Sequence, residues 1–146
     1  MREERLVDTL KSQLQGYLNC VELCRALHRQ TRDPYLKKAL EPVVEDLQDS
    51  LSSLAGHTRR LGAAPGGREL DHEGMARIQE VLSIRALYDQ MVVVRHCLVD
   101  LAQRYEEYLY PLQAGQDSDD WLISLSEEAR RILKEWERQM DEMAAP

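Results

Sequence analysis

The chain has 146 residues, of which 43% are hydrophobic and 31% are charged, and its formal net charge is −7. A chain of this length fits one domain and can bury a core without disulfides or a structural metal. The acidic balance argues against a nucleic-acid partner and against an anionic membrane surface, because both need a basic face. Residues 91–94 form the longest unbroken apolar run, far below the roughly 18 residues that a membrane span needs. Three cysteines, and a charged N-terminus with no apolar segment after it, predict a reduced cytoplasmic protein.

Two helices are expected in the first part of the chain, over residues 2–31 and 34–61, because apolar residues recur there at helical spacing. Asp33 is expected to cap the second helix, and Gly62 to end it. Pro42 lies on the side away from the apolar stripe, which predicts a kink rather than a break. The first stripe is Leu6, Leu10, Leu14, Tyr17, Val21, Cys24 and His28, and the second is Leu36, Leu40, Val43, Leu47, Leu51, Leu54, Thr58 and Leu61.

Two more helices are expected after a linker at residues 63–74. The third stripe is Ile84, Leu87, Met91, Val94, Leu98, Leu101, Tyr105, Tyr108 and Leu112, and the fourth is Leu122, Leu125, Ala129, Ile132, Trp136, Met140 and Met143. Pro111 and the polar segment 115–120 end the third helix, and Asp119 or Asp120 is expected to cap the fourth. No strand-like alternation of useful length occurs.

The sequence therefore predicts an all-α fold, a single antiparallel four-helix bundle over residues 1–146. Its first hairpin is expected at about residues 2–62, its linker at 63–74 and its second hairpin at about 75–143. The linker is long enough either for a compact up-and-down turn or for one long crossover, and the sequence leaves both topologies open.

The first hairpin resembles the ferritin-like superfamily of helical bundles. The resemblance is carried by Glu22 within an apolar helix, by the turn DPYLKKAL at residues 33–40 and by the helix end RRLGAAP at residues 59–65. It covers about the first 65 residues and implies a ferritin-like bundle. Di-iron members of that family bring carboxylates and Glu-x-x-His pairs into the core. Here the inward positions are apolar (Val43, Leu47, Leu51 and Leu54 in the second helix; Leu125, Ala129, Ile132 and Trp136 in the fourth). The resemblance thus implies a member without the metal site, and no cofactor is expected.

The first helix nevertheless carries one row of possible ligands. Cys20, Cys24 and His28 follow one another at i, i+4 spacing, with Glu22 nearby, and Cys97 of the third helix is able to complete the group. Thiolates and imidazoles that share one face of a helix are possible ligands of zinc or of another metal that prefers sulfur and nitrogen. The alternative is that Cys24 fills the core and that His28 interacts with the last carbonyls of its helix. These residues define the alternative function, a metal-binding or oxidoreductase bundle with an atypical site.

Two weaker signals of a binding site each have an ordinary structural explanation as well. Glu69 and His72 form a Glu-x-x-His pair, but it lies in the Gly-rich linker and has no matching second pair. Four aromatic residues near the turn between the third and fourth helices either line a small-molecule pocket or form the amphipathic end of the core; they are Tyr105, Tyr108, Tyr110 and Trp121.

The third helix has apolar residues outside its main stripe, including Val81, Val92 and Val99, with Ile78 and Leu82. A helix that is apolar on more than one side is expected to be buried on more than one side. Val81, Val92 and Val99 are therefore predicted to form an interface with a second copy of the chain, as a homodimer, or with another helical protein. The expected function is non-catalytic binding or scaffolding through this surface.

Overall fold

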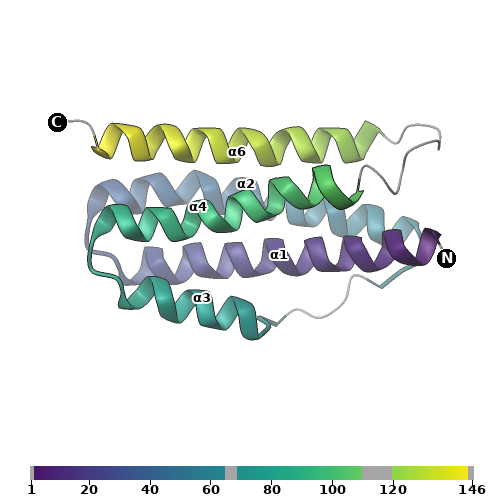
Figure 1. Cartoon of the computed structure of the whole chain (residues 1–146), viewed down its shortest axis with the longest axis horizontal. Helices are drawn as coiled ribbons and strands as arrows, with labels where there is room; N and C mark the ends of the chain where they lie inside the picture. The colour runs from purple at the N-terminus through teal and green to yellow at the C-terminus, as the bar shows by residue number, and fades with distance from the viewer. Residues whose placement is uncertain (1, 65–68, 110–119, 145–146) are drawn as a thin grey trace.

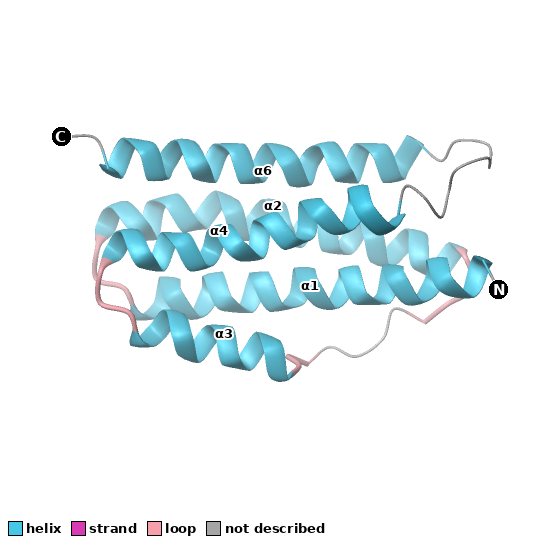
Figure 2. Ribbon diagram, viewed as in Figure 1, coloured by secondary structure: helices cyan, strands magenta, loops and turns pink. Residues whose placement is uncertain are grey.

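The computed structural model describes residues 2–64, 69–109 and 120–144, and within these ranges every regular element is a helix (Figure 2). The helices are α1 (Arg2–Gln30), α2 (Pro34–Arg60), α3 (His72–Ser83), α4 (Leu87–Arg104) and α6 (Asp120–Ala144), and a π-helical turn (Tyr105–Leu109) extends α4. The all-α prediction is confirmed. A search of the described helices for one long and apolar enough to cross a membrane finds none.

The helices α1, α2, α4 and α6 lie side by side along the long axis of the molecule, and α3 lies outside them (Figure 1). α1 packs against α2 and α4, and α6 packs against α2 and α4, so the four long helices form a ring. The chain leaves α2 at one end of the molecule and starts α4 at the other, and α3 covers part of that return along α1 (Figure 1). The connection between α2 and α4 is therefore a long crossover, the second of the two topologies that the sequence left open.

The first hairpin follows its predicted boundaries because local capping fixes both ends. The side chain of Asp33 accepts a hydrogen bond from the amide of Leu36 at 3.0 Å, and Pro34 occupies the first turn of α2. α2 continues through Pro42, whose exposed position leaves the apolar face intact. Gly62 follows the end of α2 with a φ of 82°, a left-handed conformation that glycine adopts without a steric penalty.

The prediction of a single third helix is wrong. Ile84, within the predicted stripe, is instead an extended residue (φ −82°, ψ 133°) between α3 and α4. The chain reverses at residues 84–86, where the side chain of Gln90 donates a hydrogen bond to the carbonyl of Ile84 at 2.8 Å. No Gly or Pro marks this reversal. The second half of the described chain thus holds three α-helices. Asp71 caps the first of them by accepting a hydrogen bond from the amide of Gly74 at 2.8 Å.

The core is apolar, as the stripes predict. Its largest fully buried side chains are Trp136, Tyr17, Tyr105, Leu10, Leu23, Leu27, Leu36, Leu40, Leu47, Leu54, Met91 and Leu98. Trp136 satisfies its indole N–H by donating to the carbonyl of Met91 at 2.9 Å, which joins α6 to α4. Leu61, at the end of the second predicted stripe, departs from the pattern because it is 46% exposed. His28 of the first stripe is only partly buried.

Candidate functional site

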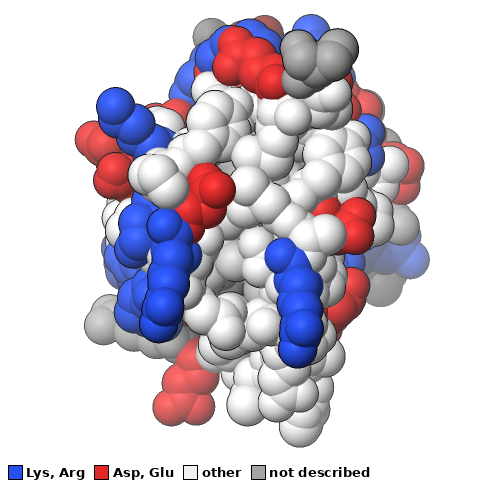
Figure 3. Space-filling view, turned by 90° about the vertical axis from the view of Figure 1, so that its left-hand side faces the viewer, with Lys and Arg blue, Asp and Glu red and all other residues white. Residues whose placement is uncertain are grey.

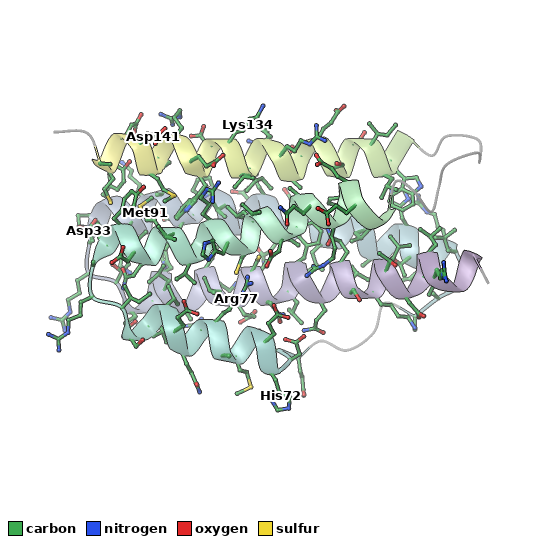
Figure 4. All side chains as sticks on the ribbon, viewed as in Figure 1. Asp33, His72, Arg77, Met91, Lys134 and Asp141 are labelled. Carbon is green, nitrogen blue, oxygen red and sulfur yellow. The ribbon has the colours of Figure 1, made fainter. Side chains whose placement is uncertain are left out.

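A cleft of about 240 Å³ opens between α1, α3 and α4. Arg77 projects from α3 into the space between these three helices (Figure 4). The cleft is lined mainly by polar and charged side chains (Ser12, Gln15, Asn19, Asp71, Glu73, Arg77, Asp100 and Arg104), together with Gly16, Cys20, Leu23, Gly74, Cys97 and Leu101. Polar groups that converge in a concave site make this cleft the candidate binding site.

The wall that α3 provides is attached to α1 by polar contacts. Asn19 donates to the carboxylate of Asp71 at 2.9 Å, and Gln15 donates to the carbonyl of Glu69 at 3.0 Å. A Cβ atom at Gly74 would lie 2.4 Å from the side-chain oxygen of Asn19. The start of α3 therefore approaches α1 so closely that residue 74 has no room for a side chain.

A pair of thiols lies at the inner end of the cleft. Cys20 of α1 and Cys97 of α4 are 3% and 4% exposed, and both line the cleft. Arg77 donates from Nη1 to Sγ of Cys97 at 3.2 Å and from Nη2 to Asp100 at 2.7 Å. The hydrogen bond from Cys20 and the positive charge of Arg77 lower the pKa of Cys97 to about 7, although burial and Asp100 act against them. Burial raises the pKa of the Cys20 thiol well above its ordinary value.

Arg104 lies at the other end of the cleft, across the backbone of α1. A Cβ atom at Gly16 would lie 2.3 Å from Nη1 of Arg104, so the guanidinium occupies the space that the glycine leaves open. Its hydrogen-bond partner is the neutral side-chain oxygen of Gln13, at 3.2 Å. Gln13, itself 0% exposed, donates in turn to the carbonyl of Leu101 at 2.8 Å. Arg104 is thereby held by a buried amide and not by a carboxylate.

The π-helical turn begins directly after Arg104. The amide of Tyr105 donates to the carbonyl of Ala102, three residues back, and the hydroxyl of Tyr105 lies 2.6 Å from that of Tyr17. Both rings are fully buried, with centroids 6.3 Å apart. This tyrosine pair fixes the end of α4 against α1, so the position of Arg104 is set by packing on both sides.

The first-helix residues proposed from sequence separate into two groups. Cys20 and Cys24 are buried, and both lie near Cys97, as the sequence suggested. Glu22 instead pairs with Arg25 at 3.0 Å, and His28 lies 3.8 Å from Glu41 of α2. Within the described residues no group of three or more His, Cys, Asp or Glu side chains is arranged to hold a metal ion.

The aromatic residues proposed to line a pocket lie in different parts of the structure. Tyr105 belongs to the core, and Trp121 stacks on His57 with a centroid separation of 4.2 Å. The side chain of Tyr108 and the whole of Tyr110 lie outside the described residues, as do the predicted helix end at Pro111 and the predicted cap Asp119. Asp120 is the first residue of α6. Glu69 and His72, the linker pair, are both exposed.

The three valines proposed as an interface differ in exposure. Val81 is 0% exposed and belongs to the core of its own chain, so it is not available to a second copy. Val92 and Val99 are partly exposed on α4. Only these two remain as surface candidates.

A second hollow lies at the end of the molecule where the α1–α2 and α3–α4 loops meet (Figure 3). Its volume is about 510 Å³, and its lining includes Arg32 and Arg85. Figure 3 shows an uncharged centre with basic side chains beside it. Both arginines are exposed and every lining side chain is at least partly exposed, so this hollow lacks the buried thiols that distinguish the cleft.

Comparison of the chain with protein-family models, with curated proteins and with solved structures finds no match. The function is therefore inferred from the geometry of the molecule.

Proposed function

We propose that the chain is a helical binding protein that holds a small ligand with a carboxylate or phosphate group in the cleft between α1, α3 and α4. Arg104 is the anchor. The proposal is a form of the non-catalytic binding function expected from sequence, with the cleft as its site.

The observation that carries the proposal is the unpaired charge of Arg104. Four arginines of the described chain are partly buried: Arg25, Arg77, Arg95 and Arg104. Each of the first three has a carboxylate oxygen within 3.0 Å. Among the described residues Arg104 has no carboxylate within 4.0 Å. A partly buried charge without a counter-ion is costly, and a guanidinium has several donors in a planar fork that matches a carboxylate or phosphate.

The surroundings of Arg104 support a ligand at this place. Ser12 supplies a further hydrogen-bond donor on the same wall of the cleft. The three acidic side chains that line the cleft have other partners: Asp100 and Glu73 lie against Arg77, and Asp71 accepts from the start of α3. The charge of Arg104 therefore stays available to an anionic group.

The experiment measures the thermal stability of the protein with a panel of small carboxylates and phosphates. A ligand that binds only the folded chain stabilises it by about 2.7 kcal/mol when its concentration is 100 times Kd. We expect at least one member of the panel to raise Tm of the wild type, and Arg104→Gln to abolish that increase. Arg95→Gln is the matched control, because Arg95 is also a partly buried arginine of α4 but pairs with Glu137 outside the cleft.

Gly16→Ala provides a second test that keeps the charge. The added methyl group would displace the guanidinium of Arg104 from its position over α1, so the increase in Tm should be lost in this variant too. No increase in Tm of the wild type with any carboxylate or phosphate would contradict the proposal. An increase that survives Arg104→Gln would contradict it as well.

We also propose a ferritin-like arrangement of the helices. One long crossover is typical of ferritin-like bundles, and it supports the resemblance that the turn at residues 33–40 suggested. Leu47 and Ile132, at central inward positions of α2 and α6, are apolar and buried. We infer a ferritin-like four-helix arrangement, extended by α3, that binds a ligand without using a di-iron centre.

Self-association is a separate proposal that rests on α4. Val92 and Val99 are seven residues apart, hence on one face of the helix, and both are partly exposed. Light scattering after size exclusion measures the mass. Val92→Glu with Val99→Glu should convert a dimer into a monomer, and an unchanged mass would exclude this interface.

A further inference from the structure

The thiols of the cleft are arranged unequally. Cys97 accepts a hydrogen bond from Arg77, whereas burial raises the pKa of the Cys20 thiol and keeps it neutral. Cys24 lies one helical turn beyond Cys20, is 1% exposed and does not line the cleft. Of the three cysteines, Cys20 and Cys97 are the two that line the cleft.

The groups around Cys97 favour its thiolate. Arg77 provides the positive charge at 3.2 Å, and Asp100 holds the guanidinium in place at 2.7 Å. Glu73, at 3.7 Å from Arg77, is the other acidic group on this arginine. The thiolate is the nucleophilic form of cysteine, and a low-pKa thiol beside a second thiol is the usual arrangement of an oxidation-sensitive cysteine with its resolving partner. The pKa of Cys97, lowered to about 7, agrees with this geometry.

We propose that Cys97 and Cys20 form a reversible dithiol–disulfide couple that is oxidised by small hydroperoxides. In the first step the Cys97 thiolate attacks the terminal oxygen of the hydroperoxide. An S–O bond forms, the O–O bond breaks, and the leaving alkoxide or hydroxide takes up a proton. In the second step the sulfur of Cys20 attacks the sulfenic acid of Cys97. An S–S bond forms, the S–O bond breaks, and water leaves with the proton of Cys20.

The structure limits the oxidant to a small molecule. The sulfur-bearing residues are 3–4% exposed at the inner end of a cleft of about 240 Å³, which a disulfide on a protein surface cannot enter. Arg77 is within reach of the breaking O–O bond, because its Nη1 already touches the attacking sulfur, and its charge stabilises the leaving oxygen anion. The net change is two thiols and one hydroperoxide giving a disulfide, an alcohol or water, and one water. A small dithiol reverses it by exchange.

The experiment treats the reduced chain with hydrogen peroxide at pH 7, blocks the remaining thiols by alkylation and maps tryptic peptides by mass. Peptide 12–25 contains Cys20 and Cys24, and peptide 96–104 contains Cys97. We expect these two peptides to be linked with the loss of two hydrogens. Cys24→Ala, the matched control, should give the same link at the same rate, which assigns it to Cys20. Fragmentation of the linked wild-type peptide gives the same assignment if this variant does not fold.

Two further variants test the roles of the couple. In Cys20→Ala the sulfenic acid of Cys97 has no partner, so dimedone should label Cys97. In Arg77→Gln the thiol of Cys97 loses its positive neighbour, so its thiolate is less favoured and oxidation at pH 7 should slow by about tenfold. A link that uses Cys24, a link only between two chains, or oxidation of Cys97 no faster than that of Cys24 would overturn the proposal. None of these measurements depends on the anionic ligand proposed for Arg104.

Discussion

Alkaline pH should destabilise this fold, because buried acids, Tyr17 and Cys24 among them, stay protonated in the folded chain. Burial raises the pKa of Tyr17 and of Cys24 above their ordinary values of 10.0 and 9.0. Above its ordinary pKa the unfolded chain has released a proton that the folded chain still binds, so stability is complete below that pH and falls as pH rises. Each group costs about 1.4 kcal/mol per pH unit. At pH 11 the expected loss is about 2.7 kcal/mol for Cys24 and about 1.4 kcal/mol for Tyr17, a large part of the 5–15 kcal/mol typical of a domain.

Urea unfolding followed by circular dichroism, with reductant present, measures this loss at pH 9, 10 and 11. Cys24→Ala should make the fall in unfolding free energy less steep by about 1.4 kcal/mol per pH unit from pH 9 upward, and Tyr17→Phe should do so only from pH 10. Comparing each variant with the wild type removes the contribution of the other titrating groups. If both variants lose stability with pH as steeply as the wild type, the two side chains are not held neutral and the reasoning is refuted.

Other substitutions follow from space and capping. Gly56→Ala should stabilise the protein by about 0.5–1 kcal/mol in urea unfolding, since no atom lies within 4 Å of the new Cβ and alanine favours the helix. Gly74→Ala should instead lower Tm, since its Cβ would collide with Asn19 and loosen α3; an increase would show that Asn19 yields freely. Asp33→Ala removes the cap of α2 and should cost about 1 kcal/mol in the same assay. Trp136→Ala should cost about 3–5 kcal/mol, and a loss below 1 kcal/mol would mean that the indole is not part of the core.

The sequence predicts the long helices well because each has one side that must face the common core. Leu10 and Leu47 are two of many stripe residues that are buried as expected. The same pattern fails at Ile84, because the chain reverses there without Gly or Pro and the apolar spacing runs on across the break. Hydrophobic periodicity records which residues are buried but not whether they belong to one helix or to two that fold back on each other.

Only part of the candidate site can be predicted from the sequence. The sequence names Cys20 and Cys97 as members of one possible ligand group, so their proximity is within reach of prediction. The positions of Arg77 and Arg104 cannot be predicted in this way, because a charged residue on a helix is ordinarily a surface group. Only the packing of α3 on α1 brings Arg77 to Cys97. The spacing of Cys97, Asp100 and Arg104 at i, i+3 and i+7 does place them on one face of α4, and this was the available signal.

α3 is attached to the rest of the molecule less firmly than the other helices are. It buries only Gly74 and Val81 completely, and its first turn is held on α1 by the hydrogen bond between Asn19 and Asp71. A segment with so little buried apolar surface opens locally at a lower free-energy cost than the whole domain, so its amide hydrogens should exchange with solvent before those of the long helices. Each such opening also moves Arg77 away from Cys97. Local unfolding of α3 is therefore expected to change both the reactivity of the Cys97 thiol and the access of reagents to it.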